Sequence, residues 1–274
     1  MTPELEVTGL ELDYEGLPVL RDLQFSLGAG EHLAILGPSG CGKSTLLRLL
    51  TGLETPSRGR ILWRGTDLTG AGSPGARPPG AGSSGHCGRF AFMGQQDLLL
   101  PWSRLWENVG LPLLLRGQPR AAVRRQVLEF LVVFGLSGFA DHFPHQLSGG
   151  MRQRAALART SLASHSGEGG ELLLLDEPFA SLDVLSRAQL QEWLDDILAH
   201  EKSTLVLVTH SVDEALLLAE RVIVLSKSPG RIVLEETVPY AGARFADKAW
   251  LPEFLAQKKR VLDVLLGSGA AHVH

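Results

Sequence analysis

GPSGCGKST, residues Gly37 to Thr45, decides the fold of this chain. Its glycines let the backbone curl tightly, so that successive N–H groups can point at phosphate oxygens with no Cβ atoms in the way. Lys43 then supplies a positive charge for the β- and γ-phosphates, and Ser44 offers an oxygen to Mg²⁺. The stretch therefore predicts a nucleoside triphosphate site formed by Gly37, Pro38, Ser39, Gly40, Cys41, Gly42, Lys43, Ser44 and Thr45.

The residues around this loop support the prediction. The apolar run from Leu33 to Leu36 is typical of a buried strand, and the run from Ser44 to Leu50, closed by Gly52, is typical of a helix. Such a helix turns the positive end of its dipole toward a bound anion. An ordinary glycine-rich turn would not need this strand and helix on either side.

The bulk composition limits the function classes. A chain of 274 residues can form one large α/β domain or a domain and a half. Its net charge of −4, from 26 basic and 30 acidic residues, gives no attraction to nucleic acid. Two cysteines, Cys41 and Cys87, have no motif spacing and indicate a reducing compartment. No signal pattern and no apolar run of about 20 residues is present, so we expect a cytoplasmic protein unless a partner docks it.

Several segments predict elements of an α/β fold. Short strand-like runs between turns over residues 4–36 predict a small, partly antiparallel sheet, and a further strand pair is expected around Arg60 to Trp63. Continuous apolar runs of strand length are typical of parallel strands covered on both faces. They are Leu172 to Leu175, Leu205 to Val208 and Val222 to Leu225.

Two further segments carry expectations of local structure. From Gln118 to Phe139 the pattern predicts a helix with Val123, Val127, Leu128 and Leu131 on one buried face. The segment Gly70 to Gly88 has almost no apolar side chains and is expected to be mobile.

Residues that bind the metal ion and position the attacking water are expected at the ends of two apolar strands. Asp176 and Glu177 end one of them, at the sheet edge where the phosphate loop lies. Asp176 can hold Mg²⁺, and Glu177 can orient or deprotonate the water that attacks the γ-phosphate. His210 follows another strand and could bind the γ-phosphate or the water, although a single histidine at a strand end is usually structural.

The stretch LSGGMRQR, from Leu147 to Arg154, indicates which class of nucleotide-binding protein this chain belongs to. Ser148, Gly149 and Gly150 open a helix, so exposed N–H groups and a hydroxyl form a second anion site at a helix N-terminus. A chain with one phosphate loop has no obvious need for this second site. The sequence therefore predicts a symmetric homodimer in which each copy completes the nucleotide site of the other.

Taken together, these motifs resemble the ATP-binding subunits of ABC transporters over about Leu5 to Leu234. The resemblance implies an α/β P-loop NTPase with a parallel-sheet core, an N-terminal antiparallel β subdomain and an inserted helical subdomain. The ATPase domain would span residues 1–240, with the helical subdomain at about 97–163 and the insert at 70–88. Residues 241–274 would form a C-terminal extension. The segment Ser164 to Gly170 also departs from the family pattern, but neither insert removes a motif residue.

Further site residues follow from the resemblance alone. Ser181-Leu182-Asp183 matches the family's dimer-contact loop, and Tyr14 falls where the family stacks a ring on adenine. The glutamine that contacts the metal and links the γ-phosphate to the membrane partner is Gln95 or Gln96, and its spacing from the LLPW motif favours Gln95. Leu98 to Trp106 with Asn108 would form the docking groove for the permease, with core packing as the alternative.

The resemblance implies an ATPase that uses ATP and Mg²⁺ at the cytoplasmic face of the membrane, as a peripheral subunit. Its partners would be an integral-membrane permease, an indirectly attached periplasmic or lipid-anchored solute-binding protein and a second copy of the chain, without nucleic acid. LLPW and DEPFASLD are similar to the branch that imports nitrate, taurine, alkanesulfonates or the hydroxymethylpyrimidine precursor of thiamine, and PHQLSGGMRQRAALART favours the pyrimidine. The alternative is a soluble ABC-type ATPase that acts on nucleic acid or ribosomes.

Overall fold

The computed structural model describes residues 3–69, 90–165, 172–201 and 203–270. Its centre is a six-stranded sheet in the order β10-β9-β3-β8-β7-β6. All neighbouring strands in it run parallel except the edge pair β10 and β9. The strands are β3 (His32–Leu36), β6 (Phe90–Met93), β7 (Leu172–Asp176), β8 (Thr204–Val208), β9 (Arg221–Leu225) and β10 (Ile232–Thr237).

Alternate residues of the parallel strands pack into hydrophobic clusters on opposite faces of this sheet. This explains why these strands consist of continuous runs of apolar residues. In β3, Leu33 and Ile35 pack into one hydrophobic cluster, and Ala34 and Leu36 pack into another on the opposite face. The strands predicted from three apolar runs are confirmed as β7, β8 and β9.

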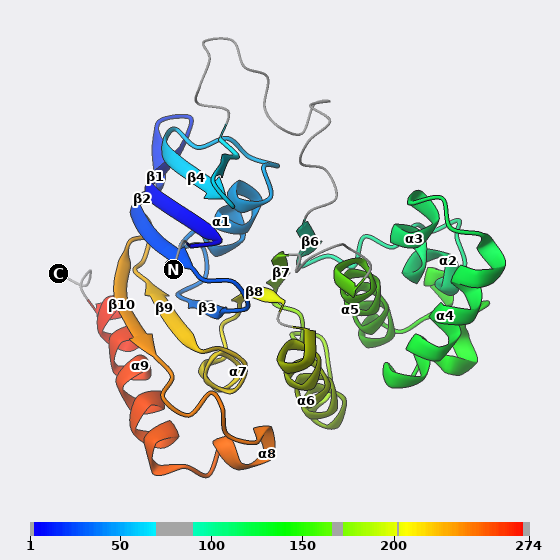
Figure 1. Cartoon of the computed structure of the whole chain (residues 1–274). Coiled ribbons are helices and arrows are strands. Elements are labelled where there is room, and N and C mark those ends of the chain that lie inside the picture. Colours follow the sequence, from blue (N-terminus) through cyan, green and yellow to red (C-terminus); the bar gives the residue numbers. More distant parts are fainter. Residues whose placement is uncertain (1–2, 70–89, 166–171, 202, 271–274) are drawn as a thin grey trace.

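A second, antiparallel sheet covers one face of the central sheet, with the helix α1 (Lys43–Leu50) packed in the same cluster (Figure 1). Its order is β2-β1-β4-β5, which confirms the antiparallel sheet expected at the N-terminus. The four strands are β1 (Leu5–Tyr14), β2 (Leu17–Leu27), β4 (Arg58–Trp63) and β5 (Thr66–Asp67).

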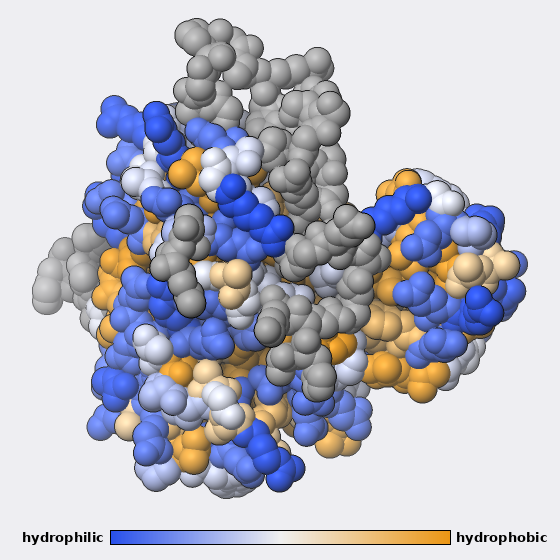
Figure 2. All heavy atoms as spheres, viewed as in Figure 1, coloured by the Kyte–Doolittle hydropathy of each residue, from blue (hydrophilic) through white to orange (hydrophobic). Residues whose placement is uncertain are grey.

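Helices form a lobe at one edge of the central sheet, next to β6 (Figure 1). The lobe contains α2 (Leu105–Val109), α3 (Leu111–Leu115), α4 (Arg120–Val133), the 3₁₀ turns η1 (Ser137–Phe139) and η2 (Pro144–Gln146), and α5 (Gly149–His165). Helix α5 is the part of the lobe nearest the sheet, and α6 (Val184–Glu201) packs into the same core. Figure 2 shows hydrophobic residues reaching the surface of the lobe among hydrophilic ones.

The helix expected from Gln118 to Phe139 is shorter than predicted. Helix α4 ends at Val133 because Gly135 takes a left-handed conformation with φ of 63°. The N–H of Leu136 then bonds to the carbonyl of Leu131, and that of Gly135 to Val132, which together form a Schellman motif. Leu128, expected on the buried face, is 37% exposed, whereas the other three residues of that face are buried.

The residues after Tyr240 form α8 (Phe245–Lys248) and α9 (Pro252–Ala270). Phe254 and Val261 of α9 are buried in the same cluster as α7 (Val212–Leu218), on one face of the central sheet. Helix α9 therefore adds to the core on that face of the central sheet. The segment 70–88, expected to be mobile, lies outside the described residues, as do Cys87 and residues 166–170 of the second insert.

Candidate active site

Polar residues follow the carboxyl ends of four parallel strands, which meet at one edge of the central sheet. The phosphate loop follows β3, Gln95 follows β6, Asp176 and Glu177 end β7, and His210 follows β8. In open α/β sheets this is the edge where ligands bind. The topology therefore brings together residues that lie more than 170 positions apart in the chain.

The phosphate loop has a shape that requires glycine at two positions. Gly42 has φ of 101°, and a Cβ there would lie 2.6 Å from Cδ2 of Leu20. A Cβ on Gly37 would lie 2.7 Å from Sγ of Cys41. Both glycines thus allow the loop to fold tightly against β2 and against itself, at the start of α1.

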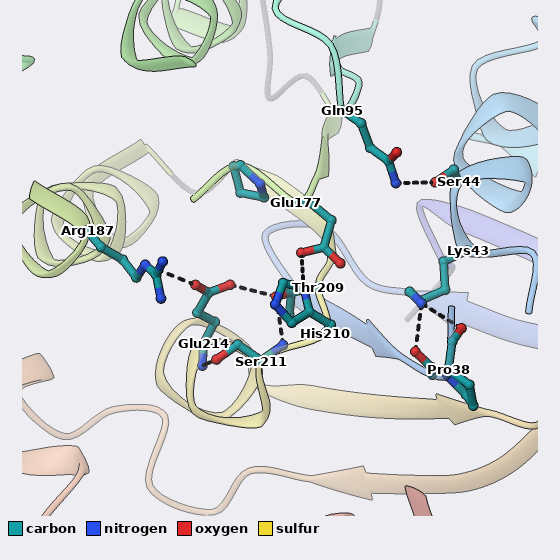
Figure 3. A network of polar contacts seen from close by, with 12 residues as sticks. Pro38, Lys43, Ser44, Gln95, Glu177, Arg187, Thr209, His210, Ser211 and Glu214 are labelled. Carbon is teal, nitrogen blue, oxygen red and sulfur yellow. Dashed lines mark hydrogen bonds and ion pairs between the residues drawn. The ribbon is translucent and has the colours of Figure 1, made fainter. Parts of the chain in front are cut away.

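The ammonium group of Lys43 lies over this loop. Its Nζ donates hydrogen bonds to the carbonyl oxygens of Gly37, at 2.7 Å, and of Pro38, at 3.0 Å (Figure 3). The positive charge therefore sits inside the concave side of the loop, where backbone N–H groups also favour an anion. Cys41 is fully buried, and burial raises the pKa of its thiol, so it is a packing residue.

Asp176 has the properties of a metal ligand. Its side chain is only 2% exposed, and its Oδ1 has no hydrogen-bond partner among the described residues. Burial raises the pKa of this carboxyl, and the nearby hydroxyl of Ser44 opposes that rise. A desolvated carboxylate with an unpaired oxygen is stabilised by a cation.

Ser44 and Gln95 complete an oxygen-rich pocket next to this carboxylate. Nε2 of Gln95 donates to Oγ of Ser44 at 3.1 Å, and both residues line a cavity of about 260 Å³ with Asp176. Carboxylate, hydroxyl and amide oxygens are the hard donors that Mg²⁺ prefers. The residues therefore fit this ion. Gln96 also lines the cavity, but the hydrogen bond to Ser44 favours Gln95 as the functional glutamine.

Glu177 and His210 form a close pair. Nδ1 of His210 lies 2.6 Å from Oε2 of Glu177, whose side chain is 15% exposed. Glu177 has φ of 54°, which is rare for a residue other than glycine, and its N–H bonds to the carbonyl of Val208. This unusual backbone turn aims the carboxylate back along the sheet edge, toward the histidine (Figure 3).

Half of the predicted site residues line one cavity of about 420 Å³, while Asp176 lines the adjoining smaller one. The larger cavity is lined by the phosphate loop and the first residues of α1 together with Gln95, Glu177 and His210. Tyr14, at the end of β1, is 39% exposed and does not line this cavity. Its pKa is raised by burial and then by a hydrogen bond to Glu54, and Thr45 of the loop is also in contact with its hydroxyl.

The residues of the LSGGMRQR stretch do not line that cavity. Oγ of Ser148 accepts the N–H of Met151 at 3.3 Å and so caps α5, while Gly149 lines a neighbouring groove with Gln95 and Ser181. A Cβ on Gly150 would lie 3.2 Å from the carbonyl oxygen of Ser181. In a single chain, the two predicted anion sites therefore belong to different cavities, and Gln95 lines both.

The dimer-contact loop expected at Ser181 to Asp183 opens α6. Oδ1 of Asp183 accepts the N–H of Ser186 at 3.0 Å, and this bond lowers the pKa of the Asp183 carboxyl. Nε2 of Gln153, on α5, lies 3.4 Å from the carbonyl oxygens of Glu177 and Pro178. This buried amide joins α5 to the segment that follows β7.

Part of the expected docking groove is core instead. Trp106 is 7% exposed and lies under the guanidinium groups of Arg120 and Arg124, and Asn108 is fully buried. The Asn108 side chain bonds the backbone of Leu100, Ser103 and Arg104, so it shapes the loop before α2. The prediction that these two residues form a contact surface is wrong. Leu98 and Trp102 remain exposed, at 62% and 73%.

Sequence reasoning missed several polar residues behind the site, notably Thr209, Glu214 and Arg187. The pattern Ser211-x-x-Glu214 at the start of α7 is a capping signal that could have drawn attention to the second of them. Arg187 has no local signal, because the carboxylate that it faces, Glu214, lies on another helix.

The family model of the ABC transporter matches residues 20–180. The chain belongs to this family. It is 38% identical to the taurine import ATP-binding protein TauB of Yersinia pestis, over 94% of this chain and 95% of TauB. It is also 41% identical to the formylaminopyrimidine import ATP-binding protein ThiZ of Halalkalibacterium halodurans, over 81% of this chain and 79% of ThiZ.

Solved structures of ABC cassettes have the same fold. The dimeric structure of MJ0796, a bacterial ABC transporter cassette, matches with a TM-score of 0.73 and 28% identity, over 85% of this chain and 98% of that chain. A second structure of MJ0796, in a post-hydrolysis state bound to ADP and Pi, gives a TM-score of 0.72. The chain is therefore an ABC ATPase that binds ATP and couples its hydrolysis to transport.

Proposed function

We propose that this ATPase energises the import of a small solute through an integral-membrane permease, the solute being a sulfonate such as taurine, nitrate, or a pyrimidine precursor of thiamine. The observation that carries the proposal is the match to TauB along almost the whole of both chains. The identities to TauB and ThiZ, 38% and 41%, are too close to choose between their solutes. A soluble ATPase acting on nucleic acid or ribosomes has no support among these relatives.

The proposal assigns a role to each group of site residues. Lys43 and the N–H groups from Gly37 to Thr45 hold the triphosphate and neutralise its charge. Asp176, Ser44 and Gln95 are the residues that would hold Mg²⁺. When bound, this ion supplies positive charge against the β- and γ-phosphate oxygens. Tyr14 would contact the adenine from the end of β1.

The Glu177 and His210 pair would place the attacking water. Because Oε2 of Glu177 contacts His210, the other carboxylate oxygen is the one available to a water molecule. Glu177 would accept a proton from that water as the water oxygen bonds to the γ-phosphorus, while the bond from the γ-phosphorus to the bridging oxygen breaks and ADP leaves. His210 would keep the carboxylate oriented, and its largely exposed ring lines the same cavity as the phosphate loop, where it could donate to a phosphate oxygen.

A second copy of the chain would complete each site. Ser148, Gly149, Gly150 and Asp183 lie outside the cavity of their own chain, which fits a role at the nucleotide of a facing chain. The dimeric cassette of MJ0796 supports such an assembly. Two nucleotides would then be held between two identical surfaces, and hydrolysis would allow the copies to separate.

The remaining partners lie at the membrane. No helix within the described residues is both long and apolar enough to cross a bilayer, so membrane attachment would come from the permease. The chain would act as a peripheral subunit at the cytoplasmic face, with Leu98 and Trp102 exposed for docking. A periplasmic or lipid-anchored solute-binding protein would deliver the solute to the permease.

Uptake of labelled solutes tests the proposal directly. Cells that lack this chain are compared with cells that carry it, using taurine, nitrate and formylaminopyrimidine in separate assays. We expect uptake of one solute to depend on the chain and to be lost with Lys43→Ala, because the lysine charge is needed for triphosphate binding. Chain-dependent uptake of none of the three, or co-purification with nucleic acid in place of a membrane protein, would contradict the proposal.

A further inference from the structure

A buried carboxylate lies directly behind the Glu177 and His210 pair. Glu214, in the first turn of α7, is only 5% exposed. Its Oε2 accepts a hydrogen bond from Oγ1 of Thr209 at 2.6 Å, and Thr209 is the residue that precedes His210. The carboxylate therefore acts on the backbone turn that carries the histidine.

Thr209 and Ser211, the two neighbours of His210, are both connected to Glu214 by hydrogen bonds (Figure 3). The N–H of Ser211 donates to Oγ1 of Thr209 at 3.1 Å, and the N–H of Glu214 lies 3.3 Å from Oγ of Ser211. A continuous chain of hydrogen bonds thus runs from Ser211 through Thr209 to Glu214. His210 itself is largely exposed, so this chain fixes the turn beneath the histidine ring.

Arg187 links the same carboxylate to the dimer-contact loop. Its Nε lies 4.0 Å from Oε1 of Glu214, and its guanidinium donates to the carbonyl of Leu182 at 3.1 Å. Leu182 belongs to the Ser181–Asp183 loop. Glu214 therefore bonds to the turn that carries His210, and it also pairs with the arginine that contacts the dimer-contact loop.

Helix capping alone does not explain this arrangement. In a Ser-x-x-Glu capping box, the glutamate side chain would accept the N–H of the serine. Here Thr209 accepts that N–H, and the Glu214 carboxylate is turned inward. Burial raises the pKa of Glu214, whereas the Thr209 hydroxyl and Arg187 oppose that rise. Because burying a carboxylate costs stability, a role beyond capping is indicated.

We propose that Glu214 is a positioning residue for ATP hydrolysis: it holds His210 against Glu177 through Thr209 and Ser211, and it joins this turn to the dimer-contact loop through Arg187. The inference rests on the proposed roles of Glu177 and His210. It predicts that Glu214 affects turnover through the histidine and has little effect on nucleotide affinity.

Steady-state ATP hydrolysis by the full chain tests the inference. For Glu214→Ala we expect kcat to fall by roughly tenfold or more, with KM for ATP changed by less than about twofold. Glu214→Gln retains an oxygen for Thr209 and should recover most of the lost kcat. Asp213→Ala is the matched control: Asp213 is the adjacent carboxylate of α7, but it pairs with Lys258 of α9, so its loss should leave both constants unchanged.

A double-mutant cycle separates positioning from a general structural effect. In the His210→Ala background, Glu214→Ala should reduce kcat by less than about twofold, because the residue acts through a histidine that is already absent. Fold losses that simply multiply would overturn the inference, as would full turnover by a folded Glu214→Ala protein. If Glu214→Ala does not fold, Thr209→Val removes the same hydrogen bond to Glu214. It should then lower kcat in the wild-type background and have little effect in the His210→Ala background.

The cycle also separates this inference from the proposed mechanism. Full turnover by His210→Ala would refute the proposed role of the histidine, and the positioning role would fall with it. A strong loss in His210→Ala combined with wild-type kcat in Glu214→Ala would refute the positioning role alone.

Discussion

At the scale of single residues, the phosphate loop combines two requirements that only glycine meets. Gly42 needs both a left-handed backbone and the absence of a Cβ, because Leu20 of β2 occupies the adjacent space. The sequence pattern correctly indicated glycine for geometry, but it could not show which neighbour sets the limit. Leu20 lies on a strand of the other sheet, so the contact appears only in the folded chain.

Gly42→Ala should therefore destabilise the protein more than backbone strain alone does. We expect a loss of about 2–5 kcal/mol, from the left-handed conformation and the clash with Leu20 together. Gly65→Ala is the matched control, because Gly65 also has positive φ but a Cβ there meets nothing within 4 Å; it should cost about 1–2 kcal/mol. Urea unfolding followed by circular dichroism measures both, and equal losses would contradict the role of the clash.

At the scale of secondary structure, the sequence predicts an element well when its own residues determine it. The apolar runs of β7 and β8 could be identified because both faces of the central sheet are covered. The end of α4 was missed because the pattern of apolar residues continues past Gly135, where the left-handed turn stops the helix. The network of Glu214 was missed for another reason: its members come from α6, α7 and the end of β8, and no local pattern joins them.

The two tryptophans near α2 illustrate the same limit. Both lie in a proline-broken run, and no local pattern distinguishes the buried ring from the exposed one. Trp106→Ala should cost about 3–5 kcal/mol, because the ring is buried in the helical lobe. Trp102→Ala should change the free energy of unfolding by less than about 0.5 kcal/mol but weaken co-purification with the permease, since this ring is exposed.

Thermal unfolding and membrane pull-down of the two variants check this contrast. Wild-type stability in Trp106→Ala would show that the ring does not support the lobe. Undiminished co-purification of Trp102→Ala would exclude this ring from the docking surface.

At the scale of the whole molecule, each chain has two predicted anion sites that belong to different cavities. A second copy of the chain would explain this arrangement. The phosphate loop lines the large cavity, while Ser148 caps α5 beside a different groove. The pattern of motifs predicted both sites but not their spacing, which depends on how the helical lobe sits against the sheet. Gln153 contributes to that placement by bonding the segment after Glu177.

If facing chains share their nucleotides, dimer formation and nucleotide binding should be separable by mutation. Glu177→Gln keeps the shape of the site but removes the base, so with ATP and Mg²⁺ it should elute from size exclusion as a dimer that turns over slowly. Adding Ser148→Arg should return this protein to the monomer, because the bulky cation obstructs the surface that faces the second nucleotide. ATP should still bind, since the phosphate loop of each chain is intact. Ser137→Arg, an exposed serine of the same lobe, is the control and should leave the dimer in place. A persistent dimer in the Ser148→Arg protein, or loss of ATP binding by its monomer, would show that the N-terminus of α5 does not act at the nucleotide of the facing chain.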